Sequence, residues 1–307
     1  MPRPIMYGML PQPLDGFRWV RAPGGTGLLC RPLARVAPHI FTTREWSLGS
    51  TKAATPDDFH WADVAHAMDV EPPGLIRVRQ VHGAAVFVRR SGDSMAGLKT
   101  GATVVDAEAD IIVSDNPALA LAVQTADCVP LLVADRRTGA VAAAHAGWRG
   151  TAARVAVAAV EALVREFGSQ PASLVAAVGP SIGACCYEVG DEVRQRFERE
   201  GFLAEELTRW FLRHTRQTPR NPSMPGVSAV ARAGHWYFDL WRATREQLEA
   251  AGVPAGQIHI AGLCTASHQV ALCSYRRDGS GTGRLAAVIR RGGPAAGNPR
   301  IRVRTSE

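Results

Sequence analysis

Two histidines and one cysteine stand at the ends of predicted strands, in motifs whose residue types could bind a metal ion. They are His82 in RQVHG, Cys128 in TADCVPLLVAD and His145 in AAAHAGWRG. Zinc prefers such a set of imidazoles and thiolate, and three protein ligands leave the fourth tetrahedral position open for water or substrate. Spacing alone does not establish the site, because no CxxC or HExxH pattern ties the three residues together. The motifs therefore favour a catalytic metal centre without proving one.

The AHAGWRG motif also carries groups that suit an anion. Gly147 and Gly150 allow a close backbone approach, and Arg149 offers a planar guanidinium to a phosphate or carboxylate. A helix is predicted to begin at about Thr151, and its first amides favour an anion nearby. We expect Arg149 to bind phosphate, with a buried structural arginine as the alternative.

Three further residues are candidates for the same site. Asp127 lies next to Cys128 and could orient a ligand histidine or act as acid and base, unless it is only a turn carboxylate. Ser181, in the glycine-rich turn 179–183, could point into a second anion cradle. Arg276, in the SYRRDG motif, is expected to form part of the active-site wall.

The elements that must position these residues are predicted to be short apolar strands and a few helices. Residues 75–81 and 84–89 read as a hairpin turning at His82 and Gly83. Apolar runs predict buried strands at 110–114, 119–124, 129–134, 140–144 and 174–178. Residues 151–167 predict a helix that ends at Gly168, with an apolar stripe of Val157, Val160, Val164 and Phe167. Further helices are predicted at 191–199 and at 240–251, the latter capped by Asp239.

Length and composition place the chain among globular proteins. It has 307 residues, of which 46% are hydrophobic and 21% charged, so a sizeable core is expected. No apolar run approaches the ~20 residues of a membrane span, and the first residues lack the apolar core of a signal peptide. Six scattered cysteines form no disulfide framework. We therefore expect a cytoplasmic protein that does not act at a membrane.

The composition of the chain suggests one domain followed by a basic segment. Residues 1–290 are predicted to form one catalytic domain, with a surface insertion at about 214–234 that is rich in Arg, Pro, Ser and Asn. The net charge is +7, and more than half of the excess comes from five arginines and one glutamate in the last 18 residues. Residues 291–307 are therefore predicted to be a basic flexible tail. Nothing interleaves aromatic and basic residues as a nucleic-acid platform would, so nucleic-acid binding is not expected.

Seven motifs between about Phe41 and Ile289 carry a resemblance that covers most of the chain. In order they read RQVHG, TADCVPLL, AHAGWRG, GPSIGACCYEVG, YFDLWRATREQLEAAGV, CT and SYRRDGSGTGR. The sequence resembles the YfiH-type family, also called the laccase-domain or polyphenol oxidase family. The resemblance implies an α+β fold in which two mixed β-sheets pack together and are flanked by helices, in αββα layers.

The resemblance also implies a function. It implies a zinc-dependent purine nucleoside phosphorylase acting on inosine, adenosine or guanosine, with adenosine deaminase and methylthioadenosine phosphorylase as further activities. Its zinc ligands would be His82, Cys128 and His145, and the chain would be a monomer or homodimer. One departure lies at residues 45–50, where EWSLGS replaces a glycine-rich stretch and an SLNLG run. Arg44, in the preceding FTTR, stays a candidate contact for substrate or phosphate.

Chemistry leaves other functions open. Phosphorolysis needs an anion held against the sugar, while deamination suits a zinc ion that lowers the pKa of water to about 7. A copper polyphenol oxidase is one alternative, although multicopper sites use several HxH pairs. A cysteine hydrolase is another, with Cys128 as nucleophile and His82 or His145 as base. A non-enzymatic scaffold is the third alternative.

Overall fold

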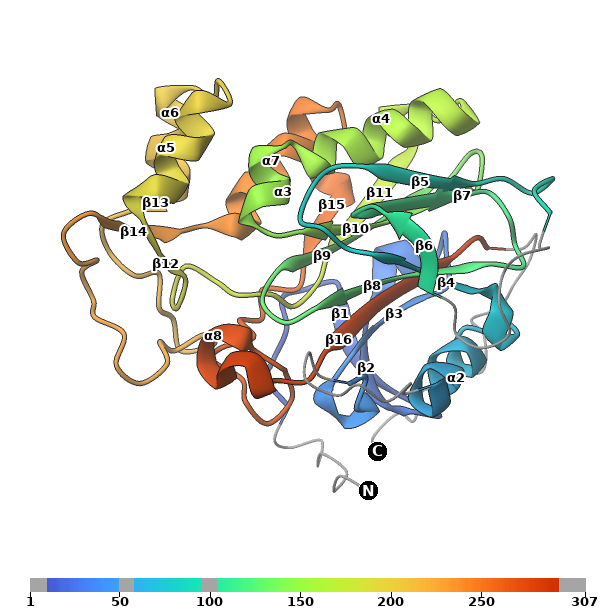
Figure 1. The fold of residues 1–307 in the computed structure, drawn as a ribbon, viewed down its shortest axis with the longest axis horizontal. Coiled ribbons are helices and arrows are strands. Elements are labelled where there is room, and N and C mark those ends of the chain that lie inside the picture. Colours follow the sequence, from blue (N-terminus) through green and yellow to red (C-terminus); the bar gives the residue numbers. More distant parts are fainter. Residues whose placement is uncertain (1–9, 50–57, 95–103, 293–307) are drawn as a thin grey trace.

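The computed structural model describes residues 10–49, 58–94 and 104–292. Two β-sheets pack face to face, and helices cover both outer faces (Figure 1). This arrangement confirms the predicted αββα layers of mixed sheets. Of the basic tail predicted at 291–307, residues 293–307 lie outside the described residues.

The larger sheet contains seven strands in the order β1-β2-β3-β16-β8-β4-β6. Most neighbours are antiparallel, but β4 runs parallel to both β8 and β6. Its strands are β1 (Phe17–Ala22), β2 (Gly25–Cys30), β3 (His39–Thr42), β4 (Leu75–Arg79), β6 (Val104–Glu108), β8 (Ala120–Thr125) and β16 (Leu285–Arg290).

The second sheet contains six strands in the order β15-β11-β9-β10-β7-β5. Its two edge strands, β15 and β5, pair in parallel with their neighbours, and the inner strands are antiparallel. Its strands are β5 (Val86–Arg89), β7 (Ile111–Ser114), β9 (Val129–Asp135), β10 (Val141–Ala146), β11 (Leu174–Val178) and β15 (Ile258–Ile260). The predicted strands at 110–114, 119–124, 129–134, 140–144 and 174–178 are thus confirmed.

The remaining elements form a helical layer, a small sheet and short turns. The three-stranded sheet has the order β12-β14-β13 and consists of β12 (Glu188–Gly190), β13 (Phe211–Leu212) and β14 (His235–Phe238). The α-helices are α1 (Arg31–Ala34), α2 (Asp58–Ala67), α3 (Trp148–Ala152), α4 (Val155–Phe167), α5 (Asp191–Arg199), α6 (Ala204–Trp210), α7 (Leu240–Ala250) and α8 (Tyr275–Asp278). The 3-10 helices are η2 (Arg44–Trp46), η3 (Pro72–Gly74), η4 (Pro171–Ser173), η5 (Ala255–Gln257) and η6 (Gly279–Gly281).

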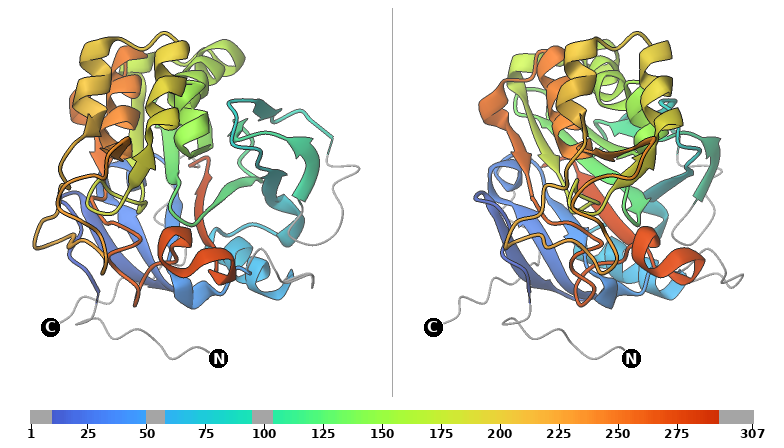
Figure 2. Two further views of the ribbon diagram at one scale, coloured as in Figure 1. Left: turned by 60° about the vertical axis from the view of Figure 1, so that its left-hand side comes forward. Right: turned by 90° about the vertical axis from the view of Figure 1, so that its left-hand side faces the viewer.

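The core lies in three apolar layers. One fills the space between the sheets, another joins the six-stranded sheet to α4 and α7, and the third joins α2 to the seven-stranded sheet. In β10 the side chains alternate, so that Ala142 and Ala144 face the helices while Val141 and Ala143 face the other sheet. Figure 2 shows α5 and α6, in yellow, beside α7 on the outer side of the six-stranded sheet.

The predicted helix at 151–167 is wrong in its start and in its buried face. The chain forms α3 first and then breaks at Arg154, whose φ of 59° is left-handed, before α4 begins. Val164 is exposed, whereas Val160 and Leu163 are buried against the sheet. The actual face combines small alanines with Val and Leu, which a stripe of large residues alone does not identify. Gly168 ends the helix in the left-handed conformation, as predicted.

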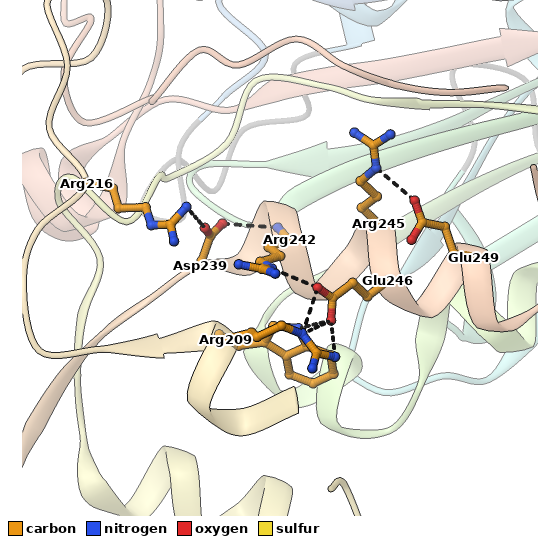
Figure 3. Close-up of polar contacts among 8 residues, drawn as sticks. Arg209, Arg216, Asp239, Arg242, Arg245, Glu246 and Glu249 are labelled. Carbon is orange, nitrogen blue, oxygen red and sulfur yellow. Dashed lines mark hydrogen bonds and ion pairs between the residues drawn. The ribbon is translucent and has the colours of Figure 1, made fainter. Parts of the chain in front are cut away.

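Helix α7 is held in place by a group of ion pairs (Figure 3). Its N-cap is Asp239, whose side chain accepts a hydrogen bond from the Arg242 amide, as predicted. Glu246 accepts hydrogen bonds from Arg242 at 2.7 Å, from Arg209 at 2.9 Å and from the indole of Trp210 at 2.8 Å. These contacts tie α7 to the end of α6.

The predicted hairpin around His82 is wrong. Strand β4 belongs to the seven-stranded sheet and β5 to the six-stranded sheet, so the chain crosses between the sheets at this turn. It crosses again between β8 and β9, where Cys128 lies. Two of the three predicted metal ligands therefore occupy the connections that join the two sheets.

No helix in the described ranges is both long enough and apolar enough to span a membrane.

Candidate metal centre

The three predicted ligands come together at one end of the two sheets. The potential ligand atoms of His82, Cys128 and His145 all lie within 4.8 Å of one another. The two imidazole rings meet edge to face, with centroids 4.8 Å apart. His145 is buried, Cys128 is half-buried and His82 is exposed, so the cluster is open on one side. Three converging donors with an open side suit a metal ion that also contacts a substrate.

Local backbone geometry explains how the ligands converge. His82 adopts a left-handed φ of 61° at the first crossing, and Asp127 has a φ of 99° just before Cys128. Both values are uncommon outside glycine and are maintained only where the surrounding structure fixes them. Gly147 must be glycine, because a Cβ there would lie 2.8 Å from the sulfur of Cys128. The backbone after β10 thus packs directly against the ligand set.

Asp110 connects both histidines and was not identified from the sequence. Its Oδ1 accepts a hydrogen bond from Nδ1 of His145 at 2.7 Å. Its two oxygens also accept hydrogen bonds from the backbone amides of Val81, His82 and Gly83, at 3.2, 3.0 and 2.6 Å. Because Nδ1 of His145 faces Asp110, Nε2 is the ring nitrogen left for a metal. The contact with a histidine that was expected for Asp127 is therefore made by Asp110.

Electrostatic interactions within the cluster favour its charged forms. Burial opposes charge on Cys128, but the neighbouring imidazoles of His145 and His82 lower the pKa of its thiol to about 6. Burial likewise opposes charge on His145, yet Cys128 and Asp110 raise the pKa of this imidazole to about 9. Hydrogen bonds from His145 and from the backbone amides lower the pKa of Asp110 against the effect of burial. The lowered pKa of Cys128 favours its thiolate, the form that binds metals.

A cavity of about 680 Å³ opens beside the cluster. Its lining combines aromatic side chains with arginines. The aromatic residues are Trp148, Tyr187 and Tyr275, and the arginines are Arg79, Arg149, Arg276 and Arg284. A second cavity of about 720 Å³ adjoins it and shares four lining residues, namely Trp148, Arg149, Tyr187 and Arg276. Flat rings and cationic groups around one space suit an aromatic ligand that carries or accompanies an anion.

Asp127 lies on the cavity wall and is firmly held. Its Oδ1 accepts a hydrogen bond from the hydroxyl of Thr265 at 2.6 Å, and its Oδ2 accepts one from the backbone amide of Arg276 at 2.6 Å. Burial raises the pKa of Asp127 despite these bonds. A carboxyl with a raised pKa beside a metal cluster suits proton transfer.

The structure separates the remaining predicted site residues into two groups. Arg149 and Arg276 line the cavity together with Asp127. Ser181 does not line it, since this buried hydroxyl accepts a hydrogen bond from the Trp241 indole at 2.7 Å. Arg44 does not line it either, and its guanidinium donates a hydrogen bond to the carbonyl of Gln269. An anion role for Ser181 or Arg44 therefore has no support from this geometry.

Sequence reasoning missed several residues of the site besides Asp110. Tyr187 lies in the CCYEVG motif, whose aromatic position was the available signal. Arg79 is the first residue of the RQVHG motif and Arg284 is the last residue of SYRRDGSGTGR, so membership of these motifs was the available signal for both.

Comparison with known proteins places this site in a family. The model of the family described as "Multi-copper polyphenol oxidoreductase laccase" matches residues 58–292. In fold, the chain is similar to the Bacillus licheniformis hypothetical protein YfiH, with a TM-score of 0.74 and 28% sequence identity. That match covers 90% of this chain and 99% of the Bacillus protein.

Relatives of similar sequence carry two enzyme names. A "Purine nucleoside phosphorylase" of Deinococcus radiodurans is 35% identical over 86% of this chain and 93% of its own length. Another of that name, from Bacteroides thetaiotaomicron, is 38% identical, and the match spans 59% of this chain and 60% of the relative. "Adenosine deaminase RL5", from an unknown prokaryotic organism, is 33% identical over 74% of this chain and 79% of its own length.

Proposed function

The chain belongs to the YfiH-type, or laccase-domain, family, and on that premise we propose that it is a zinc-dependent purine nucleoside phosphorylase. The observation that carries the proposal is the His82, Cys128 and His145 cluster, which opens onto a cavity lined by aromatic rings and arginines. The reaction would convert inosine, adenosine or guanosine with phosphate into free base and ribose 1-phosphate.

The residues present fit a zinc ion. Two nitrogens and one sulfur are the donor types that zinc prefers, and the absence of a Cβ at Gly147 leaves the sulfur accessible. Asp110 holds the His145 ring in the tautomer that a metal requires. When bound, zinc would supply Lewis acidity toward an oxygen or nitrogen of the substrate.

The cavity residues would perform the remaining steps. Arg149 and Arg276 would hold phosphate, since guanidinium groups bind phosphate oxygens in a bidentate manner. The rings of Tyr187 and Trp148 would stack on the purine. Asp127, whose pKa is raised, would hold a proton and donate it to the departing base. Positioning of the phosphate against the sugar would supply most of the rate enhancement.

Adenosine deamination is the second candidate activity. The relative named "Adenosine deaminase RL5" favours it, because it aligns over 74% of this chain. The same Asp127 would move the proton in that reaction. Phosphorolysis of methylthioadenosine would need only a cavity that accepts a thioether at the sugar.

Two other chemistries use the same residues. A multicopper oxidase requires several histidine pairs, whereas the potential ligand clusters in the described residues contain two histidines in all. A cysteine hydrolase would use Cys128 as a nucleophile, and its thiolate would react with iodoacetamide in the metal-free protein as isolated. Under the zinc proposal bound metal protects Cys128 from alkylation, and chelation exposes it.

The test of the proposal is an assay of zinc-loaded protein with inosine and with adenosine, each with and without phosphate. Chromatography would follow free base and inosine formation. Phosphate-dependent release of hypoxanthine from inosine supports the proposal. Turnover of adenosine to inosine without phosphate supports the deaminase, and no turnover of either nucleoside by zinc-loaded protein refutes both.

A further inference from the structure

A second cluster of potential metal ligands lies outside the site described above. Cys185 and Cys186 are adjacent in the turn before β12, and Cys264 follows β15. All three side chains are buried, and their sulfur atoms lie within 4.8 Å of one another. The chemistry proposed for the cavity uses none of them. Convergence of three buried thiols from two distant segments therefore needs its own explanation.

The three sulfur atoms all lie within 4.8 Å of one another and can be compared with the geometry around a single tetrahedral ion. With zinc–sulfur bonds near 2.3 Å, neighbouring sulfurs lie ~3.8 Å apart and a fourth oxygen ligand lies ~3.5 Å from each sulfur. Oγ of Ser267 is 3.6 Å from the sulfur of Cys185 and 3.7 Å from that of Cys186. This hydroxyl donates its proton to the carbonyl of Pro222 at 2.6 Å, which leaves a lone pair free. Both distances match the spacing expected of an oxygen ligand in the fourth position.

Backbone amides prepare two of the sulfurs to carry negative charge. The amide of Gly183 donates a hydrogen bond to the sulfur of Cys264, and the amide of Met224 donates one to the sulfur of Cys186, each at 3.3 Å. An N–H donor stabilises a thiolate more than a thiol, because a hydrogen bond to a charged acceptor is about twice as strong as one to a neutral acceptor. Such donors are typical of the outer shell of metal–thiolate sites.

A further side chain fixes the backbone that carries the ligands. Asn221 accepts a hydrogen bond from the Cys264 amide at 2.8 Å and donates one to the carbonyl of Gly262 at 2.9 Å. Asn221 is buried, although it lies in the segment 214–234, which was expected to be a surface insertion. That segment therefore contributes Asn221, Pro222 and Met224 to the surroundings of the cluster.

Charge and access also suit an ion at this place. Three buried thiolates without a cation would be unfavourable, and a divalent ion reduces their net charge to a single negative unit. The guanidinium of Arg277 donates hydrogen bonds to the carbonyls of Thr265 and Ala266, the two residues that follow Cys264, at 2.8 and 3.3 Å. Cys186 also lines the second cavity, through which an ion can enter.

We propose that Cys185, Cys186 and Cys264, with Ser267 in the fourth position, bind a second zinc ion with a structural role. The site is closed by four protein ligands, which is the property of structural rather than catalytic zinc. It would join the turn at 183–187 to the segment at 262–267. Because Thr265 holds Asp127 by a 2.6 Å hydrogen bond, the ion would also stiffen the wall of the first cavity.

Metal analysis of the full chain, purified with zinc and passed through a chelating resin, tests the proposal. Wild type should retain two zinc ions per chain, Cys264→Ser one, His82→Ala one, and the double variant none. Cys273→Ser is the matched control, because Cys273 is a buried cysteine outside the cluster, and it should retain two. One zinc in wild type, lost in His82→Ala and kept in Cys264→Ser, overturns the proposal. One equivalent of copper in place of the second zinc also overturns it.

Cobalt substitution provides a readout that does not depend on a cysteine variant folding. The two sites together contain four thiolates, and the second contains three, so His82→Ala loaded with cobalt should keep about three quarters of the wild-type sulfur-to-cobalt absorption. Loss of all the absorption in His82→Ala refutes the second site. Since neither measurement uses nucleoside turnover, failure of the phosphorylase proposal would not affect their interpretation.

Discussion

Substitution of Asp110 by Asn tests how the metal centre is held. The change preserves shape but replaces one carboxylate oxygen with an amino group. In the wild type, Oδ1 of Asp110 accepts hydrogen bonds from Nδ1 of His145 and the backbone amide of His82. Its Oδ2 accepts hydrogen bonds from the backbone amides of Val81 and Gly83. In either orientation of the asparagine, its amino group therefore faces two donors.

The expected loss follows from these contacts. If the amino group faces His145, it donates to Nδ1, and the ring must then carry its proton on Nε2, which removes the metal ligand. If it faces Val81 and Gly83 instead, two backbone amides lose their acceptor and the His82 turn loosens. Loss of an outer-shell carboxylate typically costs 10–100-fold in metal affinity. Because both orientations disturb a ligand, we expect the loss of zinc affinity to lie at the upper end of this range. That loss is roughly 100-fold, which corresponds to ~2.7 kcal/mol of binding free energy.

The assay is a zinc competition titration against a chromophoric chelator at pH 7.5. The matched control is Asp135→Asn, because Asp135 is equally buried and accepts hydrogen bonds from the Arg137 amide and the hydroxyls of Thr138 and Ser173, but does not line the cavity. Asp135→Asn should lower stability and leave zinc affinity unchanged. Zinc affinity of Asp110→Asn within twofold of wild type would refute this reasoning.

Three other predictions concern the site and the helical layer. Asp127→Asn should lower kcat about 10²–10⁴-fold while retaining zinc, as measured by steady-state kinetics and metal analysis. A smaller loss of kcat, or loss of the zinc, would contradict this prediction. Cys128→Ala should lose metal and activity together but keep its circular dichroism spectrum, whereas a fully active metal-free variant would contradict the proposed role. Hydrogen bonds from arginines and Trp210 lower the pKa of Glu246 from 4.5 to about 2 against the effect of burial, so its stabilising effect is complete above pH 4.5 and is lost as the pH falls toward 2. Urea unfolding of Glu246→Gln should therefore show a free energy of unfolding about 1–2 kcal/mol below that of wild type at pH 7, and the difference should shrink below pH 4.5. Glu249→Gln is the control, because it breaks a more exposed pair on the same helix. It should change the free energy of unfolding by less than ~0.5 kcal/mol at either pH.

The strands were predictable because each depends on local sequence, whereas the grouping of His82, Cys128 and His145 came from the family resemblance of their motifs. Buried strands such as β9 and β10 are continuous apolar runs. Cys128 directly precedes β9, His145 lies near the end of β10, and His82 lies three residues after β4. The hairpin prediction failed because a turn signal does not specify the sheet that the next strand joins. In this chain β5 pairs with β7, a partner that follows it in the sequence, instead of with β4.

Asp110 could not be predicted for a different reason. A polar residue before a buried strand is ordinary, and its meaning depends on the approach of the His82 turn and the end of β10 from elsewhere in the chain. The break at Arg154 was also invisible, because no glycine or proline marks it. Both features arise from tertiary packing, which overrides local propensity.

The placement of His82 and Cys128 on the connections between the two sheets determines when during folding the centre can exist. Each sheet alone holds an incomplete set of donors, so a chain with native secondary structure but undocked sheets has no high-affinity place for the ion. Uptake of the proposed ion would then report on the docking of the two sheets. The bound ion would in turn stabilise the docked state relative to the unfolded ensemble. The topology therefore makes formation of the donor set depend on docking of the two sheets.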